Sequence, residues 1–433
     1  MPFEFSNIPR IAIIGSGAAG LAAAYELSPF CQVTLFEAND RLGGHARTVM
    51  AGPNRDVAVD TGFIVFNEPN YPHLTKMFAD LDVPIEDSNM GFAASIGGGK
   101  LEYGLSSVGA ALAQKRNAIN PNFLRMLLDI TKFFKEAEAA ANDPHMSVAE
   151  FLDRLDMGPW FRNYYLLPIS GAIWSSTPEQ MAHFPAKSLV QFFRNHSLLS
   201  ARGHQWRTVD GGSIEYVRRI EQAILAAGAR IRLSTPVQAV RRGPDGVTIK
   251  AKGAWEEFDQ VVFASHADQS LAMLDDASAK ENEILGCFGF QDNSAVLHAD
   301  ARLMSQRRRA WASWVFKTKD LSPQPKISLT YWMNSLQNIS DDTPMFLSLN
   351  PSDEIDERLI YDRAEFRHPV FNGTAIHAQP RLDELQGVQD SWFCGAWTKW
   401  GFHEDAYGSG VKVAAAIKDR MLGAHSHQTL AAE

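Results

Sequence analysis

The chain has 433 residues, of which 45% are hydrophobic and 21% charged, and its formal net charge is −9 at pH 7. This length exceeds that at which one core usually stops growing, so two domains are expected, and the composition excludes a disordered or fibrous chain. The acidic balance argues against nucleic acid as a partner, because backbone binding needs a clustered positive surface.

The cysteines and the apolar runs of the sequence indicate in which cellular compartment the protein is expected. Cys31, Cys287 and Cys394 are few, odd in number and without C-x-x-C spacing, which argues against a disulfide framework or a metal site and favours a reducing compartment. The first strand is expected by about Arg10, which leaves no room for a signal peptide, and no run approaches the ~20 apolar residues of a membrane span. We therefore expect a cytoplasmic protein that at most attaches to the inner face of the membrane.

Residues 11–48 organise the rest of the chain. Gly15, Gly17 and Gly20 follow the apolar run 11–14 and open the helical run 21–27, which is the context of a dinucleotide-binding fingerprint. The glycines permit a tight turn, close approach of a pyrophosphate, and close packing of helix on strand, while the helix N-terminus favours phosphate. Glu37 ends the next strand 22 positions after Gly15, where a carboxylate can accept from a ribose hydroxyl.

Three further segments strengthen this interpretation. Arg41, Gly43 and Gly44 form an E-x-x-x-R-x-G-G block with Glu37. Residues 206–216, WRTVDGGSIEY, carry a second glycine pair before a helix, and residues 392–410, WFCGAWTKWGFHEDAYGSG, combine a short strand, a glycine, an acidic pair and Ser-Gly before a helix.

At these residues the chain resembles the FAD-dependent amine oxidase and phytoene desaturase superfamily. The resemblance implies an α/β fold: a Rossmann-like FAD-binding domain with an inserted α+β substrate domain built from an antiparallel sheet and helices. The expected boundaries are 1–89, 200–267 and 382–424 for the FAD-binding domain and 90–199 and 268–381 for the substrate domain, with a flexible tail at 425–433.

The resemblance also implies a set of FAD contacts from four separate stretches of chain. Since the terminal motif carries no cysteine after Cys394, we expect the FAD to be noncovalent. The implied contacts are Gly15, Ser16, Gly17, Ala18, Ala19 and Gly20; Glu37, Ala38, Arg41, Gly43, Gly44 and His45; Thr61, Gly62, Phe63 and Val237; and Gly395, Glu404, Asp405, Ser409, Gly410 and Val411.

The third of these stretches reads VAVDTGFIVFN at residues 57–67. In the resembled superfamily such a segment returns to the isoalloxazine ring, and Gly62 would let the backbone pass beneath it; an ordinary turn is the alternative. A closing helix is expected at residues 411–421, with its N-terminus at Gly410 and Val411 facing the flavin, where its dipole would favour reduction. Asp405 is expected to bind ribityl or pyrophosphate.

The substrate domain is expected to be mostly helical over residues 90–199 and to carry short antiparallel strands at 295–298, 312–317, 327–333 and 345–349. Residues 121–135 form an apolar helix whose Arg125, Lys132 and Lys135 could lie on anionic headgroups, or which could pack in the core. Residues 188–199 pose the same choice. The basic run 307–309 is a solvated loop or a second headgroup contact.

The residues near the flavin favour an apolar substrate. Amine oxidases of the superfamily carry a tyrosine two positions before the terminal Glu, where this chain has Phe402, so Phe402 and Trp400 are expected to line an apolar pocket. His45 replaces an Arg of the superfamily and could contact the pyrophosphate, or be an ordinary loop histidine. The candidate catalytic residues are His403, Tyr165 and Glu68, although His403 could also be structural.

Several blocks point to a narrower branch: GFHED at 401–405, NHSLL at 195–199 and DTGFIVFN at 60–67. This branch resembles bacterial flavoproteins of modified fatty-acid synthesis and the flavoprotein portion of plant cyclopropane fatty-acid synthases. It implies desaturation of a methyl-branched, unsaturated acyl chain on phospholipid, by proton removal and hydride transfer to flavin N5. Oxidation of a polyamine or monoamine is the second hypothesis, and a flavin-binding protein with a structural role is the third. The sequence does not choose among oxygen, a quinone and a second flavoprotein as electron acceptor.

Overall fold

A five-stranded parallel sheet forms the centre of one half of the molecule. The computed structural model describes residues 8–143, 145–166, 168–170, 178–195, 199, 204–244, 246–319, 328–351 and 353–430. The strand order is β10-β2-β1-β14-β20, and all four neighbouring pairs are parallel. The strands are β1 Arg10–Ile14, β2 Gln32–Phe36, β10 Arg230–Arg232, β14 Gln260–Phe263 and β20 Ser391–Phe393.

Both faces of this sheet are covered, which explains why β1 is a continuous apolar run. Ile11 and Ile13 point into a cluster with the helices α1 (Ala18–Leu27), α2 (Pro72–Asp80), α10 (Ile214–Ala226) and α15 (His403–Leu430). Ala12 and Ile14 point into a second cluster. That cluster includes a three-stranded antiparallel sheet, β11 Val237–Gly243, β12 Gly246–Ala251 and β13 Ala254–Phe258.

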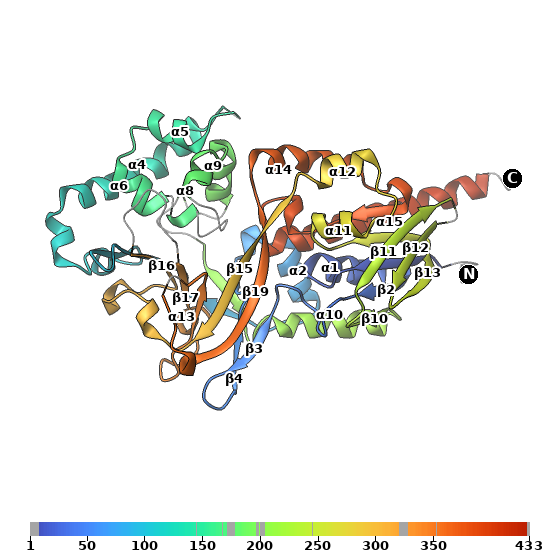
Figure 1. Cartoon of the computed structure of the whole chain (residues 1–433), viewed down its shortest axis with the longest axis horizontal. Coiled ribbons are helices and arrows are strands. Elements are labelled where there is room, and N and C mark those ends of the chain that lie inside the picture. Colours follow the sequence, from blue (N-terminus) through green and yellow to red (C-terminus); the bar gives the residue numbers. More distant parts are fainter. Residues whose placement is uncertain are drawn as a thin grey trace.

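A seven-stranded sheet forms the other half of the molecule, and its long strands β15 and β19 run between the two halves (Figure 1). Its order is β19-β15-β18-β17-β16-β7-β8, antiparallel except for the parallel pair β16 and β7. The strands are β7 Phe92–Ile96, β8 Leu101–Gly104, β15 Gly289–His298, β16 Trp314–Thr318, β17 Ser328–Trp332, β18 Phe346–Leu349 and β19 Ile360–Val370.

Helices between β8 and β9 pack over one end of this sheet and share one apolar cluster with it. Small β-sheets join the two halves: the hairpin β3 (Thr48–Ala51) and β4 (Val57–Asp60), and the sheet of β5 (Val65–Phe66), β9 (Trp206–Val209) and β6 (Ile85–Ser88). The remaining α-helices are α3 Val108–Ala111, α4 Pro121–Ala140, α5 Val148–Arg154, α6 Pro159–Phe161, α8 Pro178–Ala182, α9 Ala186–Asn195, α11 Ala267–Met273, α12 Ala279–Leu285, α13 Met333–Leu336 and α14 Gly373–Ala378.

The predicted α/β fold class is confirmed, with one local prediction wrong and two strands or hairpins missed. Residues 90–199 are mostly helical in their described part, as predicted, but they begin with a hairpin of β7 and β8 that completes the seven-stranded sheet. The long strand β19 was not predicted. The closing helix begins at His403 rather than at Gly410, since Gly408 and Gly410 lie inside α15, and it continues to Leu430. The domain boundaries themselves stay a prediction.

Helix α4 packs in the core along one face, through Phe123, Met126, Ile130 and Phe133. Two of its expected headgroup-binding side chains bind protein groups instead: Arg125 pairs with Asp129 at 3.0 Å, and Lys132 donates to the Leu155 carbonyl at 2.6 Å. Of residues 188–199, the described part to Asn195 belongs to α9, and most of the remainder lies outside the described residues.

The basic run is also partly engaged. Arg307 pairs at 2.8 Å with the buried Glu102, and Arg308 stacks over Trp311 and Trp332. All three residues of the run are exposed, as predicted for a solvated loop, although two of them also contact protein groups. No helix in the described part of the chain is both long and apolar enough to cross a bilayer.

Asp60 braces the junction between the halves. Its buried carboxylate accepts from the Ser213 N–H and hydroxyl, from the Thr48 hydroxyl at 2.5 Å and from Gln337 Nε2 at 3.0 Å. It thereby ties β4 to β3, to the start of α10 and to the loop after α13. Burial raises the pKa of Asp60 to about 6, although the four donors lower it in part.

This raised pKa predicts a pH-dependent stability. Because the folded state holds the Asp60 proton more tightly, the contribution of Asp60 is complete below pH 3.8 and is lost as pH rises through 6, by about 3 kcal/mol. We expect the Tm of wild type minus that of Asp60→Asn to fall between pH 4 and pH 7. The exposed Asp56→Asn, in the same hairpin, is the control. Parallel Tm curves for wild type and Asp60→Asn would contradict the prediction.

Candidate cofactor and substrate site

The first glycine turn joins β1 to α1 with no room for side chains at two of its three glycines. Gly15 has φ 102°, and a methyl group at Gly20 would overlap the carbonyl oxygen of Gly15. At Gly17, by contrast, no atom lies within 4 Å of the position that a Cβ would take. The first hydrogen bond of α1 runs from Leu21 N–H to the Gly17 carbonyl, so the preceding N–H groups face out of the helix end. The turn therefore leaves open space in front of free amide donors.

The second glycine turn, at Gly43 and Gly44, lies directly against the first. A Cβ at Gly44, where φ is 55°, would stand 2.9 Å from the Gly17 Cα. Arg41 holds this turn by donating to the carbonyls of Leu42, Ala46 and Gly44. The Arg41 guanidinium therefore binds backbone oxygens of the protein. Burial lowers the pKa of Arg41.

Glu37 lies at the end of β2, beside the first turn. Its Oε2 accepts from the Ser16 N–H at 2.9 Å and from the Ser16 hydroxyl at 2.5 Å, while Oε1 accepts from Asn39. The Glu37 carbonyl accepts from the Thr235 N–H at 2.8 Å, which brings the chain entering β11 at Val237 to the same edge. The exposed Ala38 follows Glu37.

The Thr61-Gly62-Phe63 segment packs on the second turn. The Phe63 N–H donates to the His45 carbonyl at 2.9 Å, and a methyl group at Gly62 would overlap that same oxygen. Thr61 N–H bonds the Arg47 carbonyl. The glycine at position 62 thus permits a close approach of two backbones.

The carboxyl-terminal segment reaches α1 from the other side. A methyl group at Gly410 would overlap the Ala19 carbonyl, so α15 crosses α1 at van der Waals distance. Gly395 has φ 151°, and its N–H donates to the Ser409 hydroxyl at 2.9 Å. Val411 follows in the helix interior. The predicted helix N-terminus at Gly410 and Val411 is therefore wrong.

Both acidic residues of this segment bind protein groups. Glu404 caps α2 by accepting from the His73 and Leu74 N–H groups, and its Oε1 also lies 2.7 Å from His73 Nδ1. Asp405 accepts from the Trp400 and Phe402 N–H groups, and Lys399 Nζ lies 3.3 Å from its carboxylate. Each carboxylate has a clear structural role, and the cofactor role predicted for Glu404 and Asp405 stays a prediction.

His403 lies between two rings. It stacks on Phe63 with centroids 4.0 Å apart, and its Nε2 lies 2.6 Å from the hydroxyl of the buried Tyr216. Burial lowers the pKa of His403 to about 3 and raises the pKa of Tyr216 well above 10. Both groups are therefore neutral at pH 7, and the Tyr216 hydroxyl shares one hydrogen bond with Nε2 of His403, whose direction depends on the tautomer of the imidazole.

Further histidines surround His45. The centroid of the His45 ring lies 5.5 Å from that of His368, 6.2 Å from that of His266 and 5.0 Å from that of Phe366. Burial, followed by the other histidines, lowers the pKa of His45 well below 6.5, and burial lowers those of His266 and His368 to about 4. Sequence reasoning missed His266, His368 and Tyr216, although Tyr216 ends the 206–216 segment that it singled out.

An aromatic wall lies beside His403. Phe402 stacks on Phe192 of α9 with centroids 4.9 Å apart, and Phe402 and Trp400 pack on the cluster of the helical region. Tyr165 is buried in that cluster, with its ring 5.3 Å from Phe161. Glu68 does not share this environment: its side chain is 58% exposed and pairs with Arg207 at 2.9 Å.

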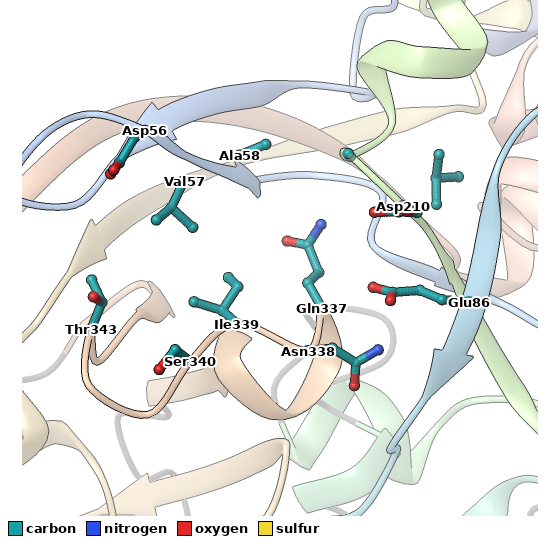
Figure 2. Close-up of a pocket in the computed structure, with 13 residues that line it drawn as sticks. Asp56, Val57, Ala58, Glu86, Asp210, Gln337, Asn338, Ile339, Ser340 and Thr343 are labelled. Atoms are coloured by element: carbon teal, nitrogen blue, oxygen red, sulfur yellow. The ribbon is translucent and has the colours of Figure 1, made fainter.

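A separate pocket of about 300 Å³ lies between β4, β6 and the loop after α13 (Figure 2). Gln337, which bonds Asp60, is one of its lining residues, with Asp56, Glu86 and Asp210. It is also lined by Gly211 and Gly212 of the 206–216 segment, but it shares no lining residue with the aromatic wall or with the turns at Gly15–Gly20 and Gly43–Gly44.

Comparison with known proteins identifies the fold. The family model for flavin-containing amine oxidoreductases matches residues 18–287. Protoporphyrinogen oxidase 2 of Arabidopsis thaliana, chloroplastic/mitochondrial, is 28% identical over 185 residues, which are 40% of this chain and 34% of that protein. The chain thus spans about a third of the length of this curated relative.

Solved structures share the fold over nearly the whole chain. Cyclohexylamine oxidase from Brevibacterium oxydans is 16% identical with a TM-score of 0.69, covering 96% of this chain and all of that one. A fatty acid isomerase from P. acnes, described as producing CLA, is 14% identical with a TM-score of 0.68, covering 94% and 98%.

The open space at Gly17 generates a sharp test. Gly17 has φ −66° and no neighbour at its Cβ position, so Gly17→Val should fold but should fill the space into which a pyrophosphate must come. We expect purified Gly17→Val to contain less than about a tenth of the wild-type FAD, with a circular dichroism spectrum like that of wild type. Gly373→Val, at an equally open glycine, is the control and should keep its FAD. Full FAD content in Gly17→Val would contradict the placement of the pyrophosphate.

Proposed function

We propose that this chain, which belongs to the family of flavin-containing amine oxidoreductases, is an FAD-dependent oxidoreductase and that it desaturates a methyl-branched, unsaturated fatty acyl chain carried on phospholipid. The electron acceptor is left open by this proposal.

The residues present fit FAD. Open space at Gly17 lies before the free N–H groups of α1, with Gly44 against it, and Glu37 stands at the ribose end. We propose that the two glycine turns hold the pyrophosphate and that Glu37 exchanges one of its present donors for a ribose hydroxyl. When bound, FAD supplies the acceptor for a hydride from the substrate.

One observation carries the acyl proposal. Phe402 stacks on Phe192, and the two carboxylates that follow it in the chain, Glu404 and Asp405, are already hydrogen-bonded to protein groups. An ammonium group would need a free acidic or phenolic partner when water is excluded. Glu404 caps α2 and Asp405 binds two N–H groups and Lys399, so neither of the carboxylates next to Phe402 is free to provide it. A hydrocarbon chain needs only the apolar wall. That a fatty acid isomerase shares the fold also supports this substrate class.

Amine oxidation is the second candidate, favoured by the family match and by the shared fold of a cyclohexylamine oxidase. The bound state of Glu404 and Asp405 counts against it. We further propose that the enzyme works at the inner face of the membrane, where phospholipid acyl chains are available.

His403 is proposed to orient rather than to accept a proton. We propose that the Tyr216 hydroxyl donates to Nε2 of His403, so that the ring offers Nδ1–H as a fixed donor. Because its pKa is lowered to about 3, it is a poor base at neutral pH. The stack on Phe63 fixes the plane of the ring, so this donor has one direction.

Substrate class can be tested by anaerobic reduction. We expect vesicles of phospholipid with methyl-branched, unsaturated acyl chains to bleach the visible flavin absorbance, because the acyl chain fits the Phe402 wall, and we expect spermine and cyclohexylamine to leave it unchanged. Phe402→Asp should lose lipid-driven reduction by more than about tenfold, as a buried charge displaces the apolar contact. Fast bleaching by either amine, and none by lipid, would replace the acyl proposal with amine oxidation.

The lowered pKa of His403 predicts a pH profile. Since His403 stays neutral from pH 8 down to about pH 4, the rate of flavin reduction should show no ionisation attributable to it between pH 5.5 and 7.5. We expect wild type and His403→Gln to have profiles of the same shape, with the variant slower throughout because the fixed donor is perturbed. The exposed His145→Gln is the control. A step near pH 6.5 that disappears only in His403→Gln would show instead that His403 is the base.

A further inference from the structure

A group of exposed hydrophobic side chains covers the outside of the helical region. Ile119 is 83% exposed, Val108 77% and Leu128 67%, with Leu105 and Leu124 about half as exposed. These five residues, which we call the apolar tip, lie within 24 positions of the sequence. Isolated exposed hydrophobics are ordinary, but such a concentration marks an interaction surface.

The apolar tip rests on a well-packed base. Asn117, in the 3₁₀ turn η2 (Lys115–Ile119), donates to the Glu102 and Ala111 carbonyls, and Asn120 caps α4 by accepting from the Phe123 N–H. Phe123 on the inner face of α4 is fully buried. The surface is thus held in place by the fold. Helix α4 lies at the opposite end of the molecule from both termini (Figure 1).

The sequence of the tip is more basic than the chain as a whole. Residues 105–135 contain five Lys and Arg and one Asp, whereas the net charge of the chain is −9. Acidic groups are also near, since Glu136 and Glu138 follow directly and Arg125 pairs with Asp156 at 3.2 Å. The one acidic residue, Asp129, is buried and bonded to Arg125 and to the Gly158 N–H. Lys115 and Lys135 are exposed and pair with no carboxylate of the described residues. Lys135 lies two turns after Leu128 on the same face of α4.

A line of aromatic contacts connects this end of the molecule with the proposed acyl wall. The ring centroids of Phe133 of α4 and Phe193 lie 5.9 Å apart, and those of Phe193 and Phe192 lie 6.3 Å apart. Phe192 in turn stacks on Phe402 with centroids 4.9 Å apart. The same apolar cluster therefore extends from beneath the tip to the residue beside His403.

We propose that the apolar tip inserts among the headgroups of an anionic phospholipid bilayer, with Lys115 and Lys135 against the lipid phosphates. Exposed apolar side chains together with exposed lysines that pair with no carboxylate are the chemistry of an interfacial membrane contact. A second copy of this chain, which could offer carboxylates to these lysines, is treated as an alternative outcome. The inference deepens the proposed function by naming the face that meets the lipid, but binding needs no turnover.

The experiment uses flavin-loaded protein without substrate and measures co-sedimentation with vesicles. We expect binding to vesicles of phosphatidylcholine with phosphatidylglycerol and at least about tenfold weaker binding to pure phosphatidylcholine. Ile119→Ser/Leu128→Ser should weaken binding at least about tenfold. Lys115→Gln/Lys135→Gln should weaken it roughly fivefold for each charge removed, with less loss at high salt.

Matched controls change similar residues elsewhere. Leu359→Ser/Val388→Ser removes exposed apolar side chains, and Lys252→Gln an exposed lysine, and both should bind as wild type does. Flavin absorbance and Tm show that each variant is folded; a tip variant that fails this check is replaced by Val108→Ser, whose side chain is 77% exposed.

The outcomes separate this inference from the proposed function. Vesicle binding that depends on the tip supports it even if lipid never reduces the flavin, which would overturn only the acyl proposal. Binding that is unchanged in both tip variants, or equal on neutral and anionic vesicles, overturns it. Loss of a dimer in Ile119→Ser/Leu128→Ser, without vesicle binding by wild type, would assign the face to a second copy and overturn it too.

Discussion

The structure depends on the absence of side chains around one short helix, α1. Gly20 lets α1 lie against the turn that precedes it, Gly410 lets α15 cross it, and Gly44 brings the second turn onto Gly17. Three segments far apart in the sequence thus meet backbone to backbone. A side chain at Gly20 or Gly410 would have to displace a carbonyl oxygen, and at 3 Å or less close-packed interiors have no slack to absorb it. The free N–H groups at the start of α1 can face a phosphate because the elements around them are fixed in this way.

The buried polar groups near α1 are also fully used in holding the chain together. Asp60 accepts hydrogen bonds from four donors in three parts of the chain, Glu404 caps α2, and Arg41 donates to carbonyl oxygens of the turn at Gly43 and Gly44. Buried polar groups are costly unless bonded, so each of these residues stabilises a junction of the chain. The cost of Asp60 is visible in its raised pKa, which burial causes and its donors only partly offset.

Local glycine chemistry was predictable from the sequence, and long-range packing was not. The βαβ order and the role of a glycine at positions 15, 17 and 20 follow from neighbouring residues alone, and the fold class followed from them. The start of α15 did not, because Gly408 and Gly410 look like helix breakers, yet here a missing side chain is what allows α15 to pack on α1. Residues 363–367 of β19 alternate charged and apolar side chains, so part of this strand was detectable from the sequence, whereas its full length follows from its pairing with β15. Tyr216 could be placed beside His403 only once the helices were assembled.

The electrostatic character of the site decides which substrates it can suit. His45, His266, His368 and His403 all have lowered pKa values because they are buried, and the neighbouring histidines lower the pKa of His45 further. The carboxylates next to Phe402 are bound by N–H groups and by Lys399. Among the described residues, a cation placed here would meet neutral rings and carboxylates that are already bound, so its desolvation would not be offset. A hydrocarbon loses no hydration that it needs, and the aromatic contacts from Phe402 to Phe133 extend the apolar cluster toward α4. The proposed apolar substrate and the proposed membrane-facing end would both follow from this arrangement of charge.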